Sequence, residues 1–138
     1  MLKTSLFLLG SIIILGFAQS ALAMTSDITL TGTSMVNSSG KPLSDFHVGT
    51  QINVQSNLTN HGKSEQKFSY VVQVLDSNGG TDWIGFNSLS LLPNQSWNVS
   101  QAWIPQTTGQ YTIQVFVWTS LTSAIPLTDV TSKQITIN

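Results

Sequence analysis

The sequence predicts an all-β protein, built as a sandwich of two antiparallel sheets with seven or eight strands. Over most of its length, apolar and polar residues alternate with a period of two, which is typical of strands that bury one face. No segment after residue 23 shows the longer period of an amphipathic helix. Clusters of Gly, Pro and Asn separate the alternating runs at the spacing of a sandwich. We therefore expect two packed sheets without interleaved helices.

The expected strands are, in chain order, residues 27–36, 50–59, 66–76, 83–91, 96–103, 111–118 and 127–137. The run at 50–59 alternates most clearly, because Ile52, Val54 and Leu58 are separated by polar side chains. In the run at 66–76, Val71 and Leu75 make the outward face partly apolar as well. The run at 83–91 is expected to be a shorter strand. The residues Asp76 to Gly80 between these two runs predict a tight hairpin.

The segment from residue 89 to 118 indicates how the chain passes from one sheet to the other. It holds two strand-like runs joined by Pro105 and Gly109, and Tyr111 follows two residues after the glycine. This order is typical of a tyrosine corner, in which the phenol hydroxyl bonds to the backbone. We expect Tyr111 to make such a bond across the sandwich. The pattern favours an immunoglobulin-like Greek-key arrangement.

The first residues have the features of a secretory signal peptide. Lys3 precedes an apolar run at residues 6–17, and small residues stand at Ala21 and Ala23. The run is shorter than the roughly 20 residues needed to span a bilayer. We expect cleavage after Ala23, one domain at residues 24–138 and no membrane insertion after cleavage. The protein is expected to be secreted or on the cell surface, in an extracellular or periplasmic location.

Composition excludes several functions. After residue 23 the chain has four Lys, no Arg and six acidic residues, so its formal net charge is 4 − 6 = −2. A dense basic face is therefore missing, which disfavours nucleic-acid binding. The chain has no Cys, which excludes disulfides, thiol chemistry and Cys-ligated metals.

Three motifs resemble a known family. They are Leu92-Pro93-Asn94-Gln95-Ser96, then Trp103-x-Pro105, then Gly109-x-Tyr111-x-Ile113-x-Val115. Together with the turn Asn60-His61-Gly62, they resemble the CARDB-like domains (cell-adhesion-related domains) and their immunoglobulin-like relatives. A weaker similarity is to the BsuPI-type proteinase-inhibitor domain. The CARDB resemblance implies an extracellular, non-catalytic module of the kind found in adhesins and surface proteins.

The aromatic residues give the best candidates for a contact site. Trp97 shares a strand face with Val99 and is expected in the core, and Trp103 matches the structural tryptophan of the resembled family. Exposed aromatic clusters usually indicate binding, although aromatics that pack beneath loops give the same pattern. The residues expected to contact a partner protein or glycan are Trp83, Phe116, Trp118 and Leu121.

Metal binding is not expected. His47 and His61 are the only histidines, and they lack the short spacing of a metal-binding pair. Met24 and Met35 could add sulfur ligands for copper, but solvated histidines in turns explain the same residues more simply. The oxygen-bearing residues Asp76, Asn78 and Asp82 suggest calcium, yet a hairpin turn accounts for them better. We expect no cofactor.

Four sequons offer possible glycosylation sites, which are Asn37, Asn57, Asn94 and Asn98. Whether they carry glycans depends on the host. Asn37 and Asn94 fall in predicted turns, where a glycan is easily accommodated.

No catalytic motif is present, so we do not expect an enzyme. The chain contains neither a Gly-x-Ser-x-Gly elbow nor a phosphate-binding glycine loop. The sequence therefore predicts an exported, non-catalytic interaction or adhesion module of the cell surface. Such a module could contact a protein or glycan partner, or self-assemble through strand edges such as Thr29–Thr33, which lack Lys and Pro. The alternative is a small extracellular inhibitor or a carrier of a ligand or metal.

Overall fold

The computed structural model describes residues 26–138, so the predicted signal peptide at residues 1–23 lies outside the described residues, as does Met24. The strands are β1 (Ile28–Val36), β2 (Ile52–Asn60), β3 (Gln66–Leu75), β4 (Thr81–Leu91), β5 (Ser96–Trp103), β6 (Gly109–Trp118) and β7 (Thr131–Ile137). The prediction of an all-β chain is confirmed for this part of the protein. Within it, no helix is long and apolar enough to cross a membrane.

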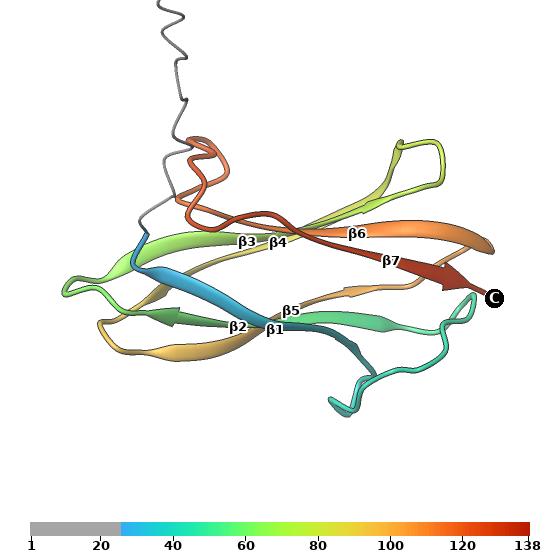
Figure 1. Cartoon of the computed structure of the whole chain (residues 1–138), viewed down its shortest axis with the longest axis horizontal. Helices are drawn as coiled ribbons and strands as arrows, with labels where there is room; N and C mark the ends of the chain where they lie inside the picture. Colours follow the sequence, from blue (N-terminus) through green and yellow to red (C-terminus); the bar gives the residue numbers. More distant parts are fainter. Residues whose placement is uncertain (1–25) are drawn as a thin grey trace, which may run out of the picture.

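The strands form two antiparallel sheets that pack face to face (Figure 1). One sheet has three strands in the order β1-β2-β5, and the other has four in the order β4-β3-β6-β7. The two-sheet sandwich predicted from the alternation is therefore confirmed. Each sheet has one face toward the other sheet and one outer face.

Strand boundaries agree with the sequence prediction to within two residues, except at the start of the last strand. The strand expected to be shorter is β4, which is in fact the longest at 11 residues, because it pairs with β3 along its whole length. The last strand begins at Thr131 rather than at residue 127. A bend at Leu127 and Thr128 interrupts it, although the Leu127 amide still donates a hydrogen bond to Val117 O on β6 (2.7 Å).

The core lies between the sheets and consists of the inward residues of alternating strands. Strand β2 alternates strictly between buried and half-buried positions, as the sequence predicts for a strand with one wet face. The largest fully buried side chains are Tyr70, Phe68, Ile52, Leu58, Leu91, Ile113 and Ile137. Burial of such side chains stabilises a domain that has no disulfide to support it.

A chain of hydroxyl groups ties the two sheets together inside the core. The Tyr70 hydroxyl on β3 donates to the Val54 carbonyl on β2 (3.1 Å) and also contacts the Ser56 hydroxyl (3.0 Å). Because Tyr70 has a single hydroxyl proton, Ser56 donates to it, and Thr33 on β1 in turn contacts Ser56 (2.9 Å). Burial raises the pKa of Tyr70 to about 12, although the bond from Ser56 lowers it in part.

The tyrosine corner is present, with a local partner. The Tyr111 hydroxyl donates to the Thr107 carbonyl four residues upstream (3.0 Å) and not to a strand across the sandwich. Its ring packs edge-on against Trp103, with ring centroids 5.2 Å apart. Trp103 is buried, as the resemblance implies. The corner therefore fixes the connection between β5 and β6.

The buried side chain of Asn60 holds the turn Asn60-His61-Gly62 in place. The side chain is buried, and its Nδ2 donates to the carbonyls of Ser64 (2.9 Å) and Leu91 (3.0 Å). Its Oδ1 accepts from the Gly62 amide (2.9 Å). A Cβ at Gly62 would come within 2.7 Å of Asp27 Oδ2, so a larger residue does not fit without rearrangement. One buried amide thus fastens the β2–β3 turn to the end of β4.

The prediction that Trp97 lies in the core is wrong. Trp97 points inward on β5, opposite the buried Leu58, but it is 42% exposed. Strand β5 is the edge of the three-stranded sheet, and Trp97 is only its second residue. The predicted inward direction of Trp97 was correct. At the end of an edge strand, however, too few neighbouring side chains are present to cover its indole.

Strand β3 is covered on both of its faces. The outward residues Ser69 and Val71 are each only 1% exposed, although outward residues of a surface sheet are normally wet. The register places Phe86 of β4 and Phe116 of β6 directly opposite Val71, one on each side. The two phenyl rings therefore shield Val71 from water on the outside of the sandwich.

The pKa of Tyr70 predicts a pH-dependent loss of stability. The folded state favours the neutral phenol, so this contribution is complete below about pH 10 and is lost as the pH rises toward about 12. A rise of two pKa units corresponds to about 3 kcal/mol. The variant Tyr70→Phe should be less stable at neutral pH by about 1–3 kcal/mol, because the Val54 carbonyl loses its partner. Urea unfolding should show that the difference in free energy of unfolding between the parent protein and Tyr70→Phe becomes smaller above about pH 10. A difference that does not change with pH would contradict a raised pKa of Tyr70.

Because Val71 is shielded, a substitution there should lower the free energy of unfolding more than is usual for a residue on the outer face of a sheet. Val71→Ala should lower the free energy of unfolding by about 2 kcal/mol, because it leaves a cavity between two phenyl rings. The matched control is Gln73→Ala at the next outward position of β3, where a change of about 0.5 kcal/mol is expected. Urea denaturation measures both values. Equal values for the two variants would show that Val71 is not shielded.

Candidate functional site

The candidate site is the outer face of the four-stranded sheet, where large apolar side chains gather around Val71. Ile84 on β4 lies opposite Gln73, and Trp118 on β6 lies opposite Ser69. We call this group the aromatic face, and its members are Val71, Ile84, Phe86, Phe116 and Trp118. They come from three neighbouring strands, so the pairing register alone holds them together.

The aromatic face is both ordered and accessible. Phe116 and Trp118 contact each other, with ring centroids 5.5 Å apart and an interplanar angle of 45°. Ile84 is 56% exposed and Phe86 is 54% exposed, while Phe116 and Trp118 are half-buried. Clusters of exposed large apolar residues on soluble domains commonly mark binding sites.

Two segments rise from the outer side of this sheet and border the aromatic face (Figure 1). At one end is the loop at residues 119–126, which follows β6, and at the other is the β3–β4 hairpin at residues 76–80. The loop contributes Thr119–Thr122, including Leu121, to a hollow of about 550 Å³ above Ser69 and Ser88. In the wall of this hollow, the buried Thr119 Oγ1 has no hydrogen-bond partner within the described residues.

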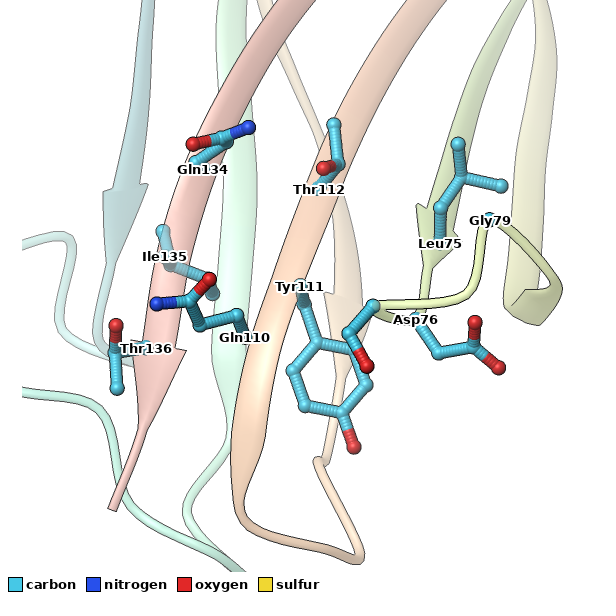
Figure 2. A pocket seen from close by; sticks show the side chains of 10 residues that line it. Leu75, Asp76, Gly79, Gln110, Tyr111, Thr112, Gln134, Ile135 and Thr136 are labelled. Atoms are coloured by element: carbon cyan, nitrogen blue, oxygen red, sulfur yellow. The ribbon is translucent and has the colours of Figure 1, made fainter.

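A second hollow of about 350 Å³ lies at the hairpin end of the face (Figure 2). Leu75, Thr112 and Gln134 form one row across β3, β6 and β7 beside it. The Asp76 carboxylate accepts bonds from the amides of Asn78 and Gly80, both at 2.9 Å. Asp76 therefore holds the hairpin turn, as the sequence predicts for this segment.

The chemistry of the face is aromatic, amide and hydroxyl, and it is uncharged. Around the aromatic residues, Ser69 bonds to Ser88 (2.9 Å) and the Gln73 amide donates to Thr81 (2.7 Å). Neither the members of the aromatic face nor these polar neighbours carry a charge. Lys67 lines the hollow at the loop end, and Asp76 lines the one at the hairpin end. Such a surface can stack, pack and hydrogen-bond, but it presents no general acid–base pair along its length.

Three of the four predicted contact residues gather on this side of the protein. Phe116 and Trp118 belong to the aromatic face, and Leu121 lines the neighbouring hollow. Trp83 does not join them. It lies opposite Val74 on the inner side of β4 and packs against the core, with its indole across Gly85. Trp83 was expected among the contact residues, but it is half-buried on the inner side of the sheet and does not belong to the aromatic face.

Ile84 and Phe86 are the members that the sequence analysis missed. Their strand is apolar in both phases, because Trp83, Leu89 and Leu91 alternate with Ile84 and Phe86. The sequence therefore shows the apolar residues at positions 84 and 86. It does not indicate which of the two alternating sets of side chains on this strand faces the core. A glycine at position 85 allows the Trp83 ring to lie flat along the inner side, since a Cβ there would be 2.3 Å from the indole. That packing fixes the phase of β4.

The outer face of the three-stranded sheet differs from the aromatic face. It is covered by amides and hydroxyls, including Asn57, whose Nδ2 donates to Asn98 Oδ1 (3.1 Å), and Thr59, which bonds to Ser96 (2.6 Å). Two predicted glycosylation sites, Asn57 and Asn98, thus lie side by side on this face. The other two lie in turns: Asn37 Oδ1 accepts backbone bonds, and Asn94 is exposed with a φ of 63°.

The residues considered for metal binding lie apart. The His61 ring contacts Thr29 Oγ1 (2.9 Å), and His47 is exposed in the segment before β2. Among residues 26–138, no three His, Asp or Glu side chains are grouped so that they could hold a metal ion.

Several solved structures share this fold at low sequence identity. The CARDB domain of a Pyrococcus furiosus protein, in complex with di-metal ions, is 16% identical with a TM-score of 0.55, and the match covers 81% of this chain and 93% of that domain. The C-terminal domain of wzt is 8% identical with a TM-score of 0.63, over 82% of this chain and 74% of that one. A β-glucuronidase from glycoside hydrolase family 2 is 15% identical with a TM-score of 0.59, over 77% of this chain.

The chain spans only 11% of the length of that β-glucuronidase, so the likeness concerns a single domain of the enzyme. At these identities the matches show the fold alone. The predicted resemblance to CARDB and immunoglobulin-like domains is confirmed. No curated protein matches the chain. The family model SlaA-like, described as S-layer A-like, matches residues 22–138, which is most of the chain, and the chain therefore belongs to the S-layer A-like family.

Proposed function

We propose that the protein is an exported, non-catalytic module of the cell surface that contacts an envelope partner through its aromatic face. Membership of the S-layer A-like family indicates a surface module. The signal peptide predicted at residues 1–23 supports export. The aromatic face is the observation that carries the contact function.

The aromatic face is costly to leave in water. Ile84 and Phe86 are each more than half exposed, and they share one face of the sheet with Phe116 and Trp118, which lie across β3. Hydrophobic contacts of this kind release about 25 cal/mol for each Å² of apolar surface that a partner covers. Binding a partner explains why these positions carry large apolar side chains on an otherwise polar surface.

Two of the four edge strands, β1 and β7, are less suited to assembly than the aromatic face. Strand β1 contains a bulge between Thr31 and Ser34, where Gly32 has a φ of 63°, although the sequence suggested an unguarded edge there. On the edge strand β7, the exposed Lys133 occupies a core-facing phase. Bulges and inward-pointing charges both discourage pairing with another chain. At these two edges, the features favour contact through a face over strand addition.

The enzymes among the structural neighbours do not argue for catalysis. The β-glucuronidase match covers a small part of that enzyme and reflects the shared sandwich. A non-catalytic role also agrees with the neutral, aromatic character of the candidate face. A binding measurement tests the proposed contact function.

The proposal predicts that the purified protein co-sediments with cell envelopes of its host. Phe86→Ser should reduce the bound fraction about tenfold, because one interface aromatic commonly contributes more than 1 kcal/mol. The matched control is Trp97→Ser, which removes an exposed aromatic on β5, outside the aromatic face. Trp97→Ser should bind like the parent protein.

Two results would contradict the proposal. The first is an equal loss of binding in both variants, which would indicate general stickiness of exposed aromatics. The second is a parent protein that stays in the supernatant of intact envelopes. Circular dichroism checks that each variant is folded.

A further inference from the structure

The aromatic face has the electrostatic character expected of a site for a neutral ligand. Its five members are uncharged, and so are the adjoining Ser69, Gln73, Ser88 and Gln114. Charged residues border the aromatic face: Lys67 and Asp76 line the two hollows, Asp82 is exposed on β4 two residues before Ile84, and Glu65 accepts a bond from Ser90 (2.7 Å). The Asp76 carboxylate is already occupied by two backbone amides of its turn. The rows of aromatic side chains themselves carry no charge, and a polyanion would meet only the single cation Lys67 beside them.

The face combines two kinds of group that a sugar ring requires. A pyranose has an apolar face of C–H groups and a rim of hydroxyls. The rings of Phe86, Phe116 and Trp118 offer electron-rich surfaces on which C–H groups pack favourably. Amides and hydroxyls alternate with these rings on the same face, and Gln73 and Gln114 lie side by side on β3 and β6. Such groups can exchange hydrogen bonds with sugar hydroxyls in either direction.

The raised segments define the direction in which a chain would lie. The 119–126 loop and the 76–80 hairpin stand at opposite ends of the strands (Figure 1). They obstruct a ligand that runs along the strands, whereas the row from Phe86 through Val71 to Phe116 crosses the strands between them. The loop also presents Ser120 and Thr122 around its hollow.

From this placement we propose that the aromatic face binds a neutral glycan chain, which lies across the strands along the row Phe86–Val71–Phe116. The inference rests on the proposed function and names the chemistry of the envelope partner. Phe86, Phe116 and Trp118 stack on sugar rings, and Gln73 and Gln114 bond to their hydroxyls. A protein partner is a different class of ligand, and the experiment below separates the two.

The test compares three preparations of host envelope in the sedimentation assay: untreated, treated with protease, and oxidised with periodate to open the sugar rings. Binding should survive protease and be lost after periodate. Calorimetry with the neutral oligosaccharides released from the envelope should then show binding. This affinity should change by less than about twofold between about 0.05 and 0.5 M NaCl, since no charges pair. The acidic oligosaccharide fraction serves as the comparison.

Variants link the binding to the aromatic face. Phe86→Ser and Ile84→Ser should each weaken the affinity for the neutral oligosaccharides about tenfold, while Trp97→Ser leaves it unchanged. Both altered side chains are more than half exposed, and Ile84 lies beside Gln73 and not beside the shielded Val71, so Ile84→Ser should disturb the fold less than Phe86→Ser. Because two different side chains are replaced, a local structural disturbance caused by one substitution would not explain a loss of affinity in both variants.

The outcomes separate this inference from the proposed function. Binding that survives periodate but not protease identifies a protein partner, which overturns the glycan inference and leaves the contact face intact. Strongly salt-dependent binding of the acidic fraction alone also overturns it. Failure to bind untreated envelopes overturns both proposals.

Discussion

The structure depends on covering strand β3 from both sides. This strand lies inside the four-stranded sheet and carries apolar side chains in both of its phases. The three-stranded sheet covers its inner side, where the hydroxyl chain from Tyr70 reaches β2. No further layer covers its outer side within the described residues, so Phe86 and Phe116 shield Val71 themselves. The shielding rings remain partly exposed, and this links the stability of the fold to the surface that we propose for contact.

The two outer faces of this thin sandwich consequently differ in chemistry. One is covered by amides and hydroxyls that bond to one another, such as Asn57 with Asn98. The other presents aromatic rings between two raised segments. A polar face satisfies its own hydrogen bonds and remains hydrated, whereas an aromatic face gains stability when a ligand covers it. A surface module with such faces can keep one side toward solvent and the other toward the envelope.

Much of the fold could be predicted from the sequence, because a strict period of two specifies which residues of each strand share a face. The strands, the two-sheet sandwich and the tyrosine corner at Tyr111 follow from local patterns, although its hydrogen-bond partner is local and not across the sandwich. The burial of Trp103 was implied by the family resemblance. Two positions did not follow. Trp97 points inward as predicted, but it lies at the end of an edge strand and is exposed. The alternation of apolar and polar residues predicts the direction of a side chain, but it does not predict the order of strands in a sheet. Trp83 lies in a strand whose two phases are both apolar.

The candidate site was therefore only partly predictable. Phe116 and Trp118 alternate with the core residues of β6, so their outward direction is evident in the sequence. Ile84 and Phe86 join them only because β4 and β6 pair with opposite sides of β3 in a particular register. Register between distant strands is a tertiary property.

Contact with an envelope partner would cover the aromatic face on the native cell surface. Because the chain has no cysteine, a single thiol can report on each face. Ser88→Cys places one beside the aromatic face and Ser100→Cys places one on the outer face of the three-stranded sheet, both at exposed positions. Labelling with a membrane-impermeant maleimide is compared between intact cells and the purified protein. We predict that the thiol at position 88 reacts with the maleimide in the purified protein but is protected on intact cells. The thiol at position 100 should react in both. Equal labelling of position 88 on cells and in solution would contradict coverage of the aromatic face.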